Sequence, residues 1–545
     1  MKAECLPFTR IPHTTRLFAD FLAASPALQP FYPRNAAFAE WFQDERGRIA
    51  YDHALRAKVA AILTAQNQRF GSSEKTLANI ARLQNGAMAI VTGQQVGLFG
   101  GPLYSILKLV HAAKLAAEAT VAGVDCVPVF WLATEDHDLA EVNHTSFLHP
   151  DGTLAALSTP SHGVPDAPVA AVTLGPEIDT VVRAATDLLG SSEAAELLRD
   201  AYQPGETLGT AFARLVARLA TDFGVIVLDG ADPALDAIAA PLYRRVIEDA
   251  AALDDALLAR GKALQTAGYH QQVKVTPLST LLFLLQDGAR LPIRRRPSNG
   301  NRNASAQPEF IAGANIFTAA QLLGRLAAAP QDFSPNALLR PVVQDYLLPT
   351  LAYVGGAAEV AYFAQAAVVY QALLGRITPI LPRFSATLVE PKSQRLLKKY
   401  SLDLEDLFHG ADALRENVAV RAFPTDVQQR FEAARTRVAE SLAGLQESLT
   451  LLDPTLLGAA ANASAKMNYQ LKRLQSRAAR AELRRQVILT RHADSLSQSL
   501  FPKNALQERE IAGIYFISRY GRSLLNDIYS AIETSCHDHH VLTIE

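Results

Sequence analysis

The segment ATEDHDLAEVNH, from Ala133 to His144, places several side chains capable of acid–base chemistry within ten residues. A histidine flanked by carboxylates can act as a general base, because a carboxylate fixes its tautomer, and the same groups can bind a divalent metal. The segment is also compatible with a solvated helix start, where Asp and Glu cap free amides. The sequence favours catalysis and leaves proton transfer and metal binding both open. The expected catalytic residues are Glu135, Asp136, His137 and Asp138.

A glycine-rich segment, TGQQVGLFGGPLYSILK, runs from Thr92 to Lys108. Its glycines would let the backbone approach a ligand closely, and the helix predicted to follow would present free amides to an anion. The pattern is neither a P-loop nor GxGxxG, so it does not specify a nucleotide. A ligand loop and a plain strand-to-helix turn fit it equally well.

A third segment, SPNALLRPVVQDYLLPTLAYVGGAAEVAYFAQ at 334–365, sets isolated polar side chains in an apolar frame. This composition is typical of a small-molecule site, and equally of a buried helix pair with satisfied polar groups. Further along, Arg383 in LPRFS could make a forked contact with a phosphate or carboxylate. The polar positions of the longer segment are Arg340, Gln344, Asp345, Glu359, Tyr362 and Gln365.

Two other clusters have simpler explanations. Residues 465–491 carry eight Lys or Arg against one Glu, which could contact a nucleotide phosphate, an RNA backbone or an acidic helix face. Such a run is most often a solvated helix face. His537, His539 and His540 follow Cys536 and superficially suggest a metal site, but we favour incidental histidines.

Composition narrows the class of protein. The 545 residues are 49% hydrophobic and 19% charged, as in globular proteins with several structural units. The 52 Lys and Arg nearly balance the 54 Asp and Glu, so nucleic acid is not an expected partner. Three separated cysteines without a CxxC pair indicate neither a disulfide framework nor a thiolate zinc site and fit a reducing cytoplasm. Without an apolar run of about 18 residues, we expect no signal peptide and no membrane span.

The apolar runs predict the scaffold that positions these segments. Residues 87–95 and 126–133 predict buried strands, and the segment between them is apolar at helical spacing over 103–120. Such a unit implies parallel strands with a right-handed crossover, and ligands bind beyond the carboxyl ends of such strands. The loops at Gly93 and Thr134 are therefore expected at the functional edge.

We therefore expect an α/β fold, with a Rossmann-like parallel-sheet core and an antiparallel α-helical coiled-coil arm. Apolar residues at spacings of three and four from Phe431 to Leu452 predict one arm helix, and 465–498 the other, joined near 454–462. The Arg-rich stretch at 291–309 predicts a loop. Other core strands are predicted at 223–230 and, as the last strand, near Glu390. The expected units are a helical segment at 1–84, the core at 85–390 with insertions at about 146–200 and 230–330, a coiled-coil domain at 391–500, and a segment returning to the core at 501–545.

Taken together, the motifs resemble the bacillithiol biosynthesis cysteine-adding family, BshC. The likeness rests on TGQQVGLFGGPLYSILK, PVFWLATEDHDLAEVNH and the 334–365 segment, followed in order by LPRFSATL and by LQEREIAGIYFISRYG at 506–521. It covers the chain from about residue 85 onward. One departure is Gly356-Ala357-Ala358-Glu359, where the family pattern has Gly-Pro; this alters local rigidity more than chemistry.

The resemblance implies a ligase that joins the carboxylate of L-cysteine to the amine of glucosaminyl malate, the last step of bacillithiol synthesis. Amide formation from a free carboxylate needs activation as an acyl phosphate or acyl adenylate, so ATP is the expected co-substrate and ADP a possible product. The resemblance also implies a homodimer formed through the coiled coil. A related phosphate-binding signature would stand at GGPLY, where the position agrees and the letters do not.

On this hypothesis, Asp136 and His137 deprotonate the attacking amine, and Arg340 and Arg383 neutralise malate or phosphate charge. An alternative is a nucleotide-binding dimeric scaffold that assists another ligase; an RNA-directed ligase relative is less compatible with the near-neutral charge. The expected cofactor-binding residues are Lys466, Arg473 and Arg509. The expected substrate-binding residues are Gly93, Gln94, Gln95, Tyr104, Lys108, Asn143, Arg340, Gln344, Asp345, Glu359, Tyr362, Arg383 and Ser385.

Overall fold

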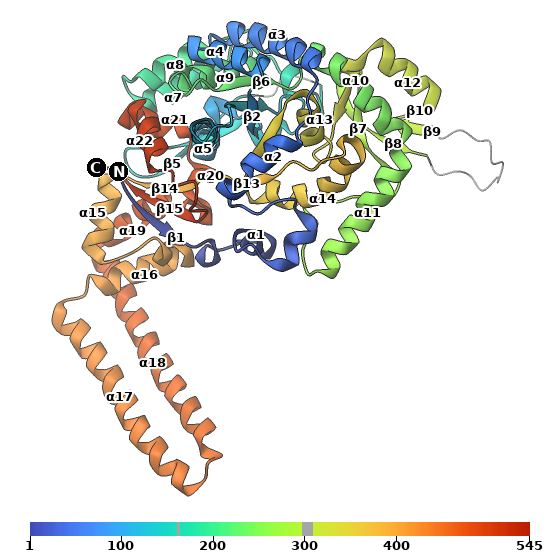
Figure 1. Cartoon of the computed structure of the whole chain (residues 1–545). Coiled ribbons are helices and arrows are strands. Elements are labelled where there is room, and N and C mark those ends of the chain that lie inside the picture. The colour runs from blue at the N-terminus through green and yellow to red at the C-terminus, as the bar shows by residue number, and fades with distance from the viewer. Residues whose placement is uncertain (161–163, 297–308) are drawn as a thin grey trace.

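A five-stranded parallel sheet forms the centre of the computed structural model, which describes residues 1–160, 164–296 and 309–545 (Figure 1). The strand order is β13-β12-β2-β3-β6, and every pairing between neighbours is parallel. These strands are almost continuously apolar and buried, as expected for a parallel sheet covered on both faces. The Rossmann-like core is confirmed. Its strands are β2 (Met88–Gln94), β3 (Cys126–Leu132), β6 (Ile226–Asp229), β12 (Thr350–Gly355) and β13 (Ile380–Pro382).

Alternate residues of each strand pack against helices on opposite faces of the sheet. On one face Val91 and Val129 share a core with α3, α10 and α14. On the other face Ile90 and Phe130 pack with α2, α5 and α9. The sheet is therefore covered on both sides, and only its ends are open to ligands. These and the adjoining helices are α1 (Arg16–Leu22), α2 (Phe42–Arg48), α3 (His53–Phe70), α4 (Glu74–Gln84), α5 (Leu103–Val121), α9 (Leu208–Leu219), α10 (Pro233–Glu248), α11 (Ala250–Thr266), α13 (Arg340–Leu347) and α14 (Ala357–Leu374).

Helix α14 is long and apolar enough to cross a membrane by length and composition, and within the described ranges it alone meets that test. It is a core helix, because 56% of its most apolar window is buried and it packs against α11 and α13. Gly375, in the left-handed conformation, ends it.

The region 230–330 contributes two core helices, α10 and α11, and most of a second, antiparallel sheet of order β10-β9-β8-β7-β11. The loop predicted over 291–309 is wrong at its start, because Leu291 to Arg295 belong to a strand in which Ile293 points into the core. The arginines masked this period-two pattern. Residues 297–308 of that prediction lie outside the described residues. The elements are β7 (Ser279–Gln286), β8 (Ala289–Arg295), β9 (Glu309–Ala312), β10 (Asn315–Thr318), α12 (Ala319–Ala328) and β11 (Phe333–Pro335).

The predicted last strand near Glu390 is two strands in different sheets. β13 completes the central sheet, whereas β14 (Ser385–Val389) pairs with β15 (His539–Thr543). β15 also pairs antiparallel with β1 (Lys2–Leu6), so segments far apart in sequence form one three-stranded sheet. Between β13 and β14 the chain turns through Arg383 and Phe384, which places Arg383 at the carboxyl edge of the central sheet.

The coiled-coil arm is confirmed. Helices α17 (Thr425–Leu452) and α18 (Leu456–Arg485) pack as an antiparallel hairpin that projects from the rest of the molecule (Figure 1). Their joint is shorter than predicted, because α18 begins at Leu456, and the second helical run breaks at Gln486. The remaining elements are α6 (Leu139–Val142), β4 (His144–Leu148), β5 (Leu154–Ser158), α7 (Ile178–Leu189), α8 (Glu193–Ala201), α15 (Pro391–Tyr400), α16 (Ala411–Arg421), α19 (Val487–Leu500), α20 (Gln507–Glu510), α21 (Gly513–Tyr520) and α22 (Ser523–Ala531).

Candidate active site

The two loops predicted at the functional edge lie side by side. Gly93 and Gln94 pair in register with Trp131 and Leu132, and the Ala133 amide donates to the Gln94 carbonyl oxygen at 2.9 Å. The ends of β12 and β13 lie in the same sheet and point the same way. Four strands therefore deliver polar side chains to one edge, which is where parallel sheets bind ligands.

A buried ion pair stands at this edge. Lys108 Nζ, from α5, lies 2.5 Å from Glu359 Oε2, from α14, and donates to the Gly93 carbonyl oxygen at 2.8 Å. Burial alone would raise the pKa of Glu359, but the Lys108 ammonium outweighs it and lowers that pKa. Burial also lowers the pKa of Lys108, an effect that Glu359 partly offsets. The pair holds helices from opposite faces of the sheet together above the strand ends.

A tyrosine-arginine network adjoins the ion pair. The Tyr353 hydroxyl donates to Glu359 Oε1 at 2.6 Å, and Arg340 donates to the hydroxyls of Tyr362 at 3.0 Å and Tyr353 at 3.3 Å. Gly93 allows this packing, because a Cβ there would lie 3.2 Å from the Tyr353 hydroxyl and 3.3 Å from the Trp131 carbonyl. Arg340 is thereby held at the edge as a cation with polar partners.

Arg383 is held by a second buried carboxylate. Its guanidinium makes a forked contact with Glu508 at 2.5 and 3.0 Å and lies over the Tyr104 ring, 5.3 Å from the centroid. Ser385 donates to the same carboxylate at 2.8 Å and also contacts His539 Nδ1 at 2.7 Å. Burial lowers the pKa of His539 to about 4, so this histidine is neutral at physiological pH.

Glu135 and Asp236 are two buried carboxyl groups of the edge. Glu135 follows β3 and is 7% exposed, whereas Asp236 lies on α10 and is 6% exposed. Burial raises the pKa of Glu135 to about 7, opposed in part by Arg290 and Arg340. Burial and the nearby Glu135 raise the pKa of Asp236. A carboxyl group that titrates near neutrality suits proton transfer.

Asp136 and His137 lie at the more open part of the edge, with side chains 34% and 32% exposed. Gln95 donates to Asp136 Oδ2 at 2.7 Å. His137 Nδ1 lies 3.0 Å from Arg290 Nη1. Because a guanidinium only donates, Nδ1 must be the acceptor, and this contact assigns the ring proton to Nε2. His137 therefore presents an N–H donor at its free side.

We expected the first backbone amides of α5 to be free to bind an anion, but part of this helix end is already hydrogen-bonded. The Leu103 amide donates to the Ile511 carbonyl oxygen at 2.9 Å, and Gly513 donates to Gly101 at 3.2 Å. The segment 511–513 thus covers this helix end, which the sequence around GGPLY did not disclose. Near this helix end, the groups of the edge that carry positive charge are the side chains of Lys108, Arg340 and Arg383.

Comparison with known proteins identifies the family. Residues 1–384 match the model "Bacillithiol biosynthesis BshC, N-terminal Rossmann-like domain", and residues 386–544 match "Bacillithiol biosynthesis BshC, C-terminal coiled-coil domain". The chain belongs to the BshC family. The boundary between the two models lies in the turn between β13 and β14.

Individual relatives match over nearly the whole length. A protein of Koribacter versatilis is 47% identical over 100% of both chains, and one of Solibacter usitatus is 38% identical over 100% of both. A protein of Salinibacter ruber is 36% identical over 97% of this chain and 96% of its own. Each of the three is named "Putative cysteine ligase BshC". The family resemblance read from the motifs is confirmed.

Most of the residues that we expected in the BshC site meet at this edge. They come from five separate stretches of the chain, which the parallel sheet and α20 bring together. Gln94 also donates to the Tyr104 hydroxyl at 3.1 Å, and Ser385 supports Arg383 through Glu508. The residues gathered here are Gly93, Gln94, Gln95, Tyr104, Lys108, Glu135, Asp136, His137, Arg340, Glu359, Tyr362, Arg383 and Ser385.

Other expected residues lie elsewhere or have structural contacts. Asp138 caps α6 by accepting from the Glu141 amide, the helix-start role that its sequence also allowed, and Asn143 ends that helix. Gln344 donates to Asp345 within α13, and its Oε1 accepts from Arg340 at 3.2 Å, so it adjoins the site behind Arg340. Asp345 interacts with Arg376, Thr350 and Thr378, which lie at the opposite, amino ends of β12 and β13.

The three residues expected to bind a cofactor do not form one group. Lys466 and Arg473 are exposed on α18, in the projecting arm (Figure 1). Arg509 is exposed on α20, where its guanidinium lies 6.0 Å from the Tyr104 ring centroid. Of the three, only Arg509 adjoins the strand-end site, because the return of the chain after the arm brings it there.

Several residues of this site escaped the sequence analysis. Asp236 and Arg290 lie in the region assigned to an insertion, and Glu508 and His539 in the segment after the arm. Tyr353 looked like another apolar position of a buried strand. Glu508 stands beside Arg509 and Glu510 in LQEREIAG, and nothing in that local pattern marks it as buried.

Proposed function

We propose that this chain is a cysteine ligase that joins L-cysteine to the amine of glucosaminyl malate in the last step of bacillithiol biosynthesis. The observation that carries this proposal is the full-length match to the BshC family, including relatives named as cysteine ligases. The site at the strand ends supports it with the groups that amide formation needs: a proton acceptor, cations for carboxylates and a hydrogen-bond donor.

Proton removal falls to the carboxylates in this proposal. An amine attacks only after it has lost its ammonium proton, and Glu135 has a pKa of about 7, suited to accept it. Asp136 is the more exposed neighbour and serves to draw the ammonium group in. His137 does not act as the base, because its Nδ1 is engaged by Arg290; its Nε2–H donates to an oxygen of the reacting carboxylate.

Arg340 and Arg383 bind the negative groups of the substrates in this proposal. Both are fixed by partners at the edge, so little side-chain freedom is lost when a carboxylate arrives. Lys108 is already paired with Glu359 and acts mainly to position Gly93 and Gln94. The substrates offer these two arginines three carboxylates to bind, two on malate and one on cysteine.

ATP is the co-substrate in this proposal, because it would supply the leaving group that a free carboxylate lacks. Arg509 fits a phosphate group, since it is exposed and lies beside Tyr104 at the mouth of the site. Lys466 and Arg473 could contact only a ligand that reaches the arm.

The arm pairs two copies of the chain in this proposal. Its hairpin exposes large apolar side chains to solvent, which is unusual for the surface of a monomeric protein. The most exposed on α17 are Leu445, Leu451 and Leu452, at 50%, 91% and 79%, and on α18 Tyr469 and Leu474, at 61% and 55%. A homodimer would cover them. We place the protein in the cytoplasm, where its thiols remain reduced.

The direct test uses the purified full chain with glucosaminyl malate, cysteine and MgATP, and measures bacillithiol by thiol labelling and mass spectrometry. We expect product that depends on all three, with ADP or AMP released in equal amount. Glu135→Gln should abolish product, whereas Asp138→Asn, a matched change at the helix cap, should retain it. Retained activity in Glu135→Gln would remove Glu135 from the mechanism.

A complementary test uses a host that lacks its own cysteine-adding gene. The wild-type chain should restore bacillithiol and lower glucosaminyl malate. If the protein restores the thiol in cells while the purified chain makes none, and the site variants still complement, the scaffold alternative is correct and the ligase proposal fails.

A further inference from the structure

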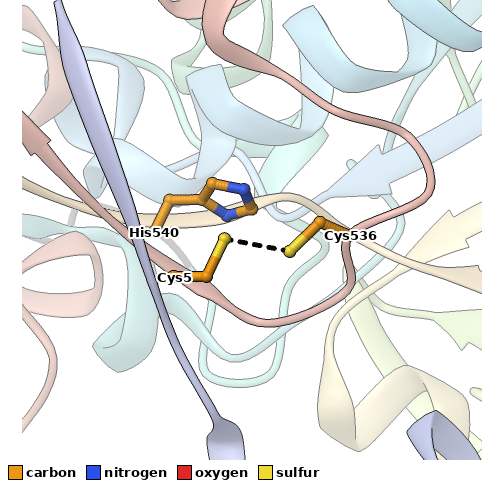
Figure 2. Close-up of side chains that lie close together, drawn as sticks. All are labelled: Cys5, Cys536 and His540. Carbon is orange, nitrogen blue, oxygen red and sulfur yellow. Dashed lines mark hydrogen bonds between the residues drawn. The ribbon is translucent and has the colours of Figure 1, made fainter.

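Three metal-ligating side chains converge outside the strand-end site. Cys5 Sγ lies 3.1 Å from Cys536 Sγ, and these two atoms and a ring nitrogen of His540 all lie within 4.8 Å of one another (Figure 2). Among the described residues no other group of His, Cys, Asp and Glu meets that criterion. Cys536 and the histidines after it suggested a metal site only superficially in the sequence, and Cys5, which lies 531 residues from Cys536, was not part of that pattern.

The backbone fixes all three positions. Cys5 in β1 pairs directly with His540 in β15, so the two side chains start from neighbouring backbone positions. Cys536 lies in the loop between α22 and β15, and its amide donates to the Glu533 carbonyl oxygen at 3.0 Å. Sheet pairing and a turn therefore place the three residues, so their proximity is set by the backbone and not by the conformations of flexible side chains.

His540 is the observation that points to a ligand. It is 1% exposed, and neither ring nitrogen has a hydrogen-bond partner among the described residues. The ring packs against Phe384 at a centroid distance of 4.5 Å, and the backbone of Asp538 and of Ser385 makes weak polar contacts with it. Buried polar groups are nearly always satisfied, and these backbone contacts are too long or too poorly aligned to be full hydrogen bonds, so an imidazole beside two thiols calls for a further partner.

We propose that Cys5, Cys536 and His540 bind one zinc ion. Two thiolates and an imidazole match the donor set that zinc prefers. In tetrahedral zinc geometry, two sulfurs about 2.3 Å from the ion lie about 3.8 Å apart, so a small side-chain rotation suffices. The fourth position faces the exposed side of Cys5 and takes water or a thiol from solution.

The surrounding charge favours a cation over a bare thiol pair. The carboxylates of Asp538 and Glu533 act on Cys5 and place negative charge beside the cluster. A dication would bind the thiolate form of the two cysteines and displace their protons. A disulfide would bring the sulfurs to about 2.0 Å and would leave His540 unsatisfied.

Zinc binding would stabilise the position of β15. His539 and His540 are adjacent in β15 and point to opposite faces of the strand. His539 contacts Ser385 and Thr387, and Ser385 contacts Glu508, the partner of Arg383. Zinc would hold β15 against β1 and thereby fix the strand that supports Arg383.

The test loads the full-length, metal-free reduced chain with cobalt(II) or zinc(II). We expect one ion per chain, a near-ultraviolet thiolate-to-cobalt absorption band, and displacement of cobalt by zinc. Zinc should also protect Cys5 and Cys536, but not unfolded controls, from alkylation read by mass spectrometry.

Variants locate the site. Cys5→Ser and Cys536→Ser, both at accessible positions, should each weaken zinc binding by at least about 100-fold and remove the sulfur-to-cobalt band. Cys126→Ala and His537→Asn, a thiol and a histidine outside the cluster, should leave both unchanged. The proposal is overturned if the wild type takes up no ion, if the band survives in Cys5→Ser, or if chain from cells contains a Cys5–Cys536 disulfide and no zinc.

Discussion

Lys108 Nζ and Glu359 Oε2 lie 2.5 Å apart and join helices α5 and α14 across the carboxyl edge of strands β2 and β12. The two helices belong to opposite layers of the sheet. This ion pair therefore closes the layered core at the point where its ligand site begins.

Replacing one member of the Lys108–Glu359 pair should lower the stability of the fold more than replacing both. Lys108→Met leaves the Glu359 carboxylate buried and unpaired, so we expect the free energy of unfolding to fall by about 3 to 5 kcal/mol. Lys108→Met combined with Glu359→Gln should recover part of that loss. Urea unfolding of the two single variants and the double variant measures the coupling. Additive effects would show that the pair is not an energetic unit.

Glu135 should make stability fall as pH rises. Its pKa in the folded chain is about 7, above the value of about 4.3 for an unfolded Glu, so the folded state binds more protons between these values. The contribution is present below pH about 4 and is lost as pH approaches about 7. Glu135→Gln should thus be more stable than the wild type by about 3 kcal/mol at pH 8, and equal at pH 4. Chemical denaturation at both pH values tests this; equal stability at pH 8 contradicts the shifted pKa.

Glu508 should make stability fall as pH is lowered, the opposite of Glu135. Burial alone would raise its pKa, but the forked contact with Arg383 outweighs burial and lowers it. Its stabilising contribution is present above the unfolded value of about 4.3 and is lost as pH falls through the lower folded pKa. Glu508→Gln should cost about 3 kcal/mol at pH 7 and less in acid. Glu510→Gln, whose partner Lys503 is exposed, is the matched control and should cost under about 1 kcal/mol.

His137 should tolerate glutamine better than asparagine. The Arg290 contact leaves Nε2–H as the functional donor, and the glutamine amide reaches that position while the asparagine amide reaches only Nδ1. We expect His137→Gln to keep about a tenth of the ligase rate and His137→Asn to lose about 100-fold. Initial rates at saturating substrates measure both. The reverse order would assign the function to Nδ1.

The arm should control oligomeric state. Leu445→Glu with Leu452→Glu places charges on the exposed apolar face of α17, so we expect sedimentation to shift from dimer to monomer without loss of helix content. Ala443→Glu adds charge at an exposed arm position about half a turn away and should leave the mass unchanged. A wild-type monomer at micromolar concentration would refute pairing through the arm.

Sequence patterns predicted elements whose information is local. The runs around Val91 and Val129 are apolar because both faces of a parallel sheet are buried, and the helix between them follows from its spacing. The same logic located Gly93 and Thr134 at the strand ends. It failed at 291–295, where the charged residues Arg294 and Arg295 hid a strand, and at the end of the core, where two short strands looked like one.

By itself, the sequence determined the family, the parallel core, the arm and the segments that carry the site, because each leaves a contiguous pattern. Only the tertiary structure decided which distant side chains meet. Lys108 and Glu359 are 251 positions apart, Arg383 and Glu508 are 125, and Cys5 and Cys536 are 531. No local pattern encodes such pairs, because their cost and benefit arise from burial in the folded chain, where an unpaired charge is unfavourable and a matched one is retained.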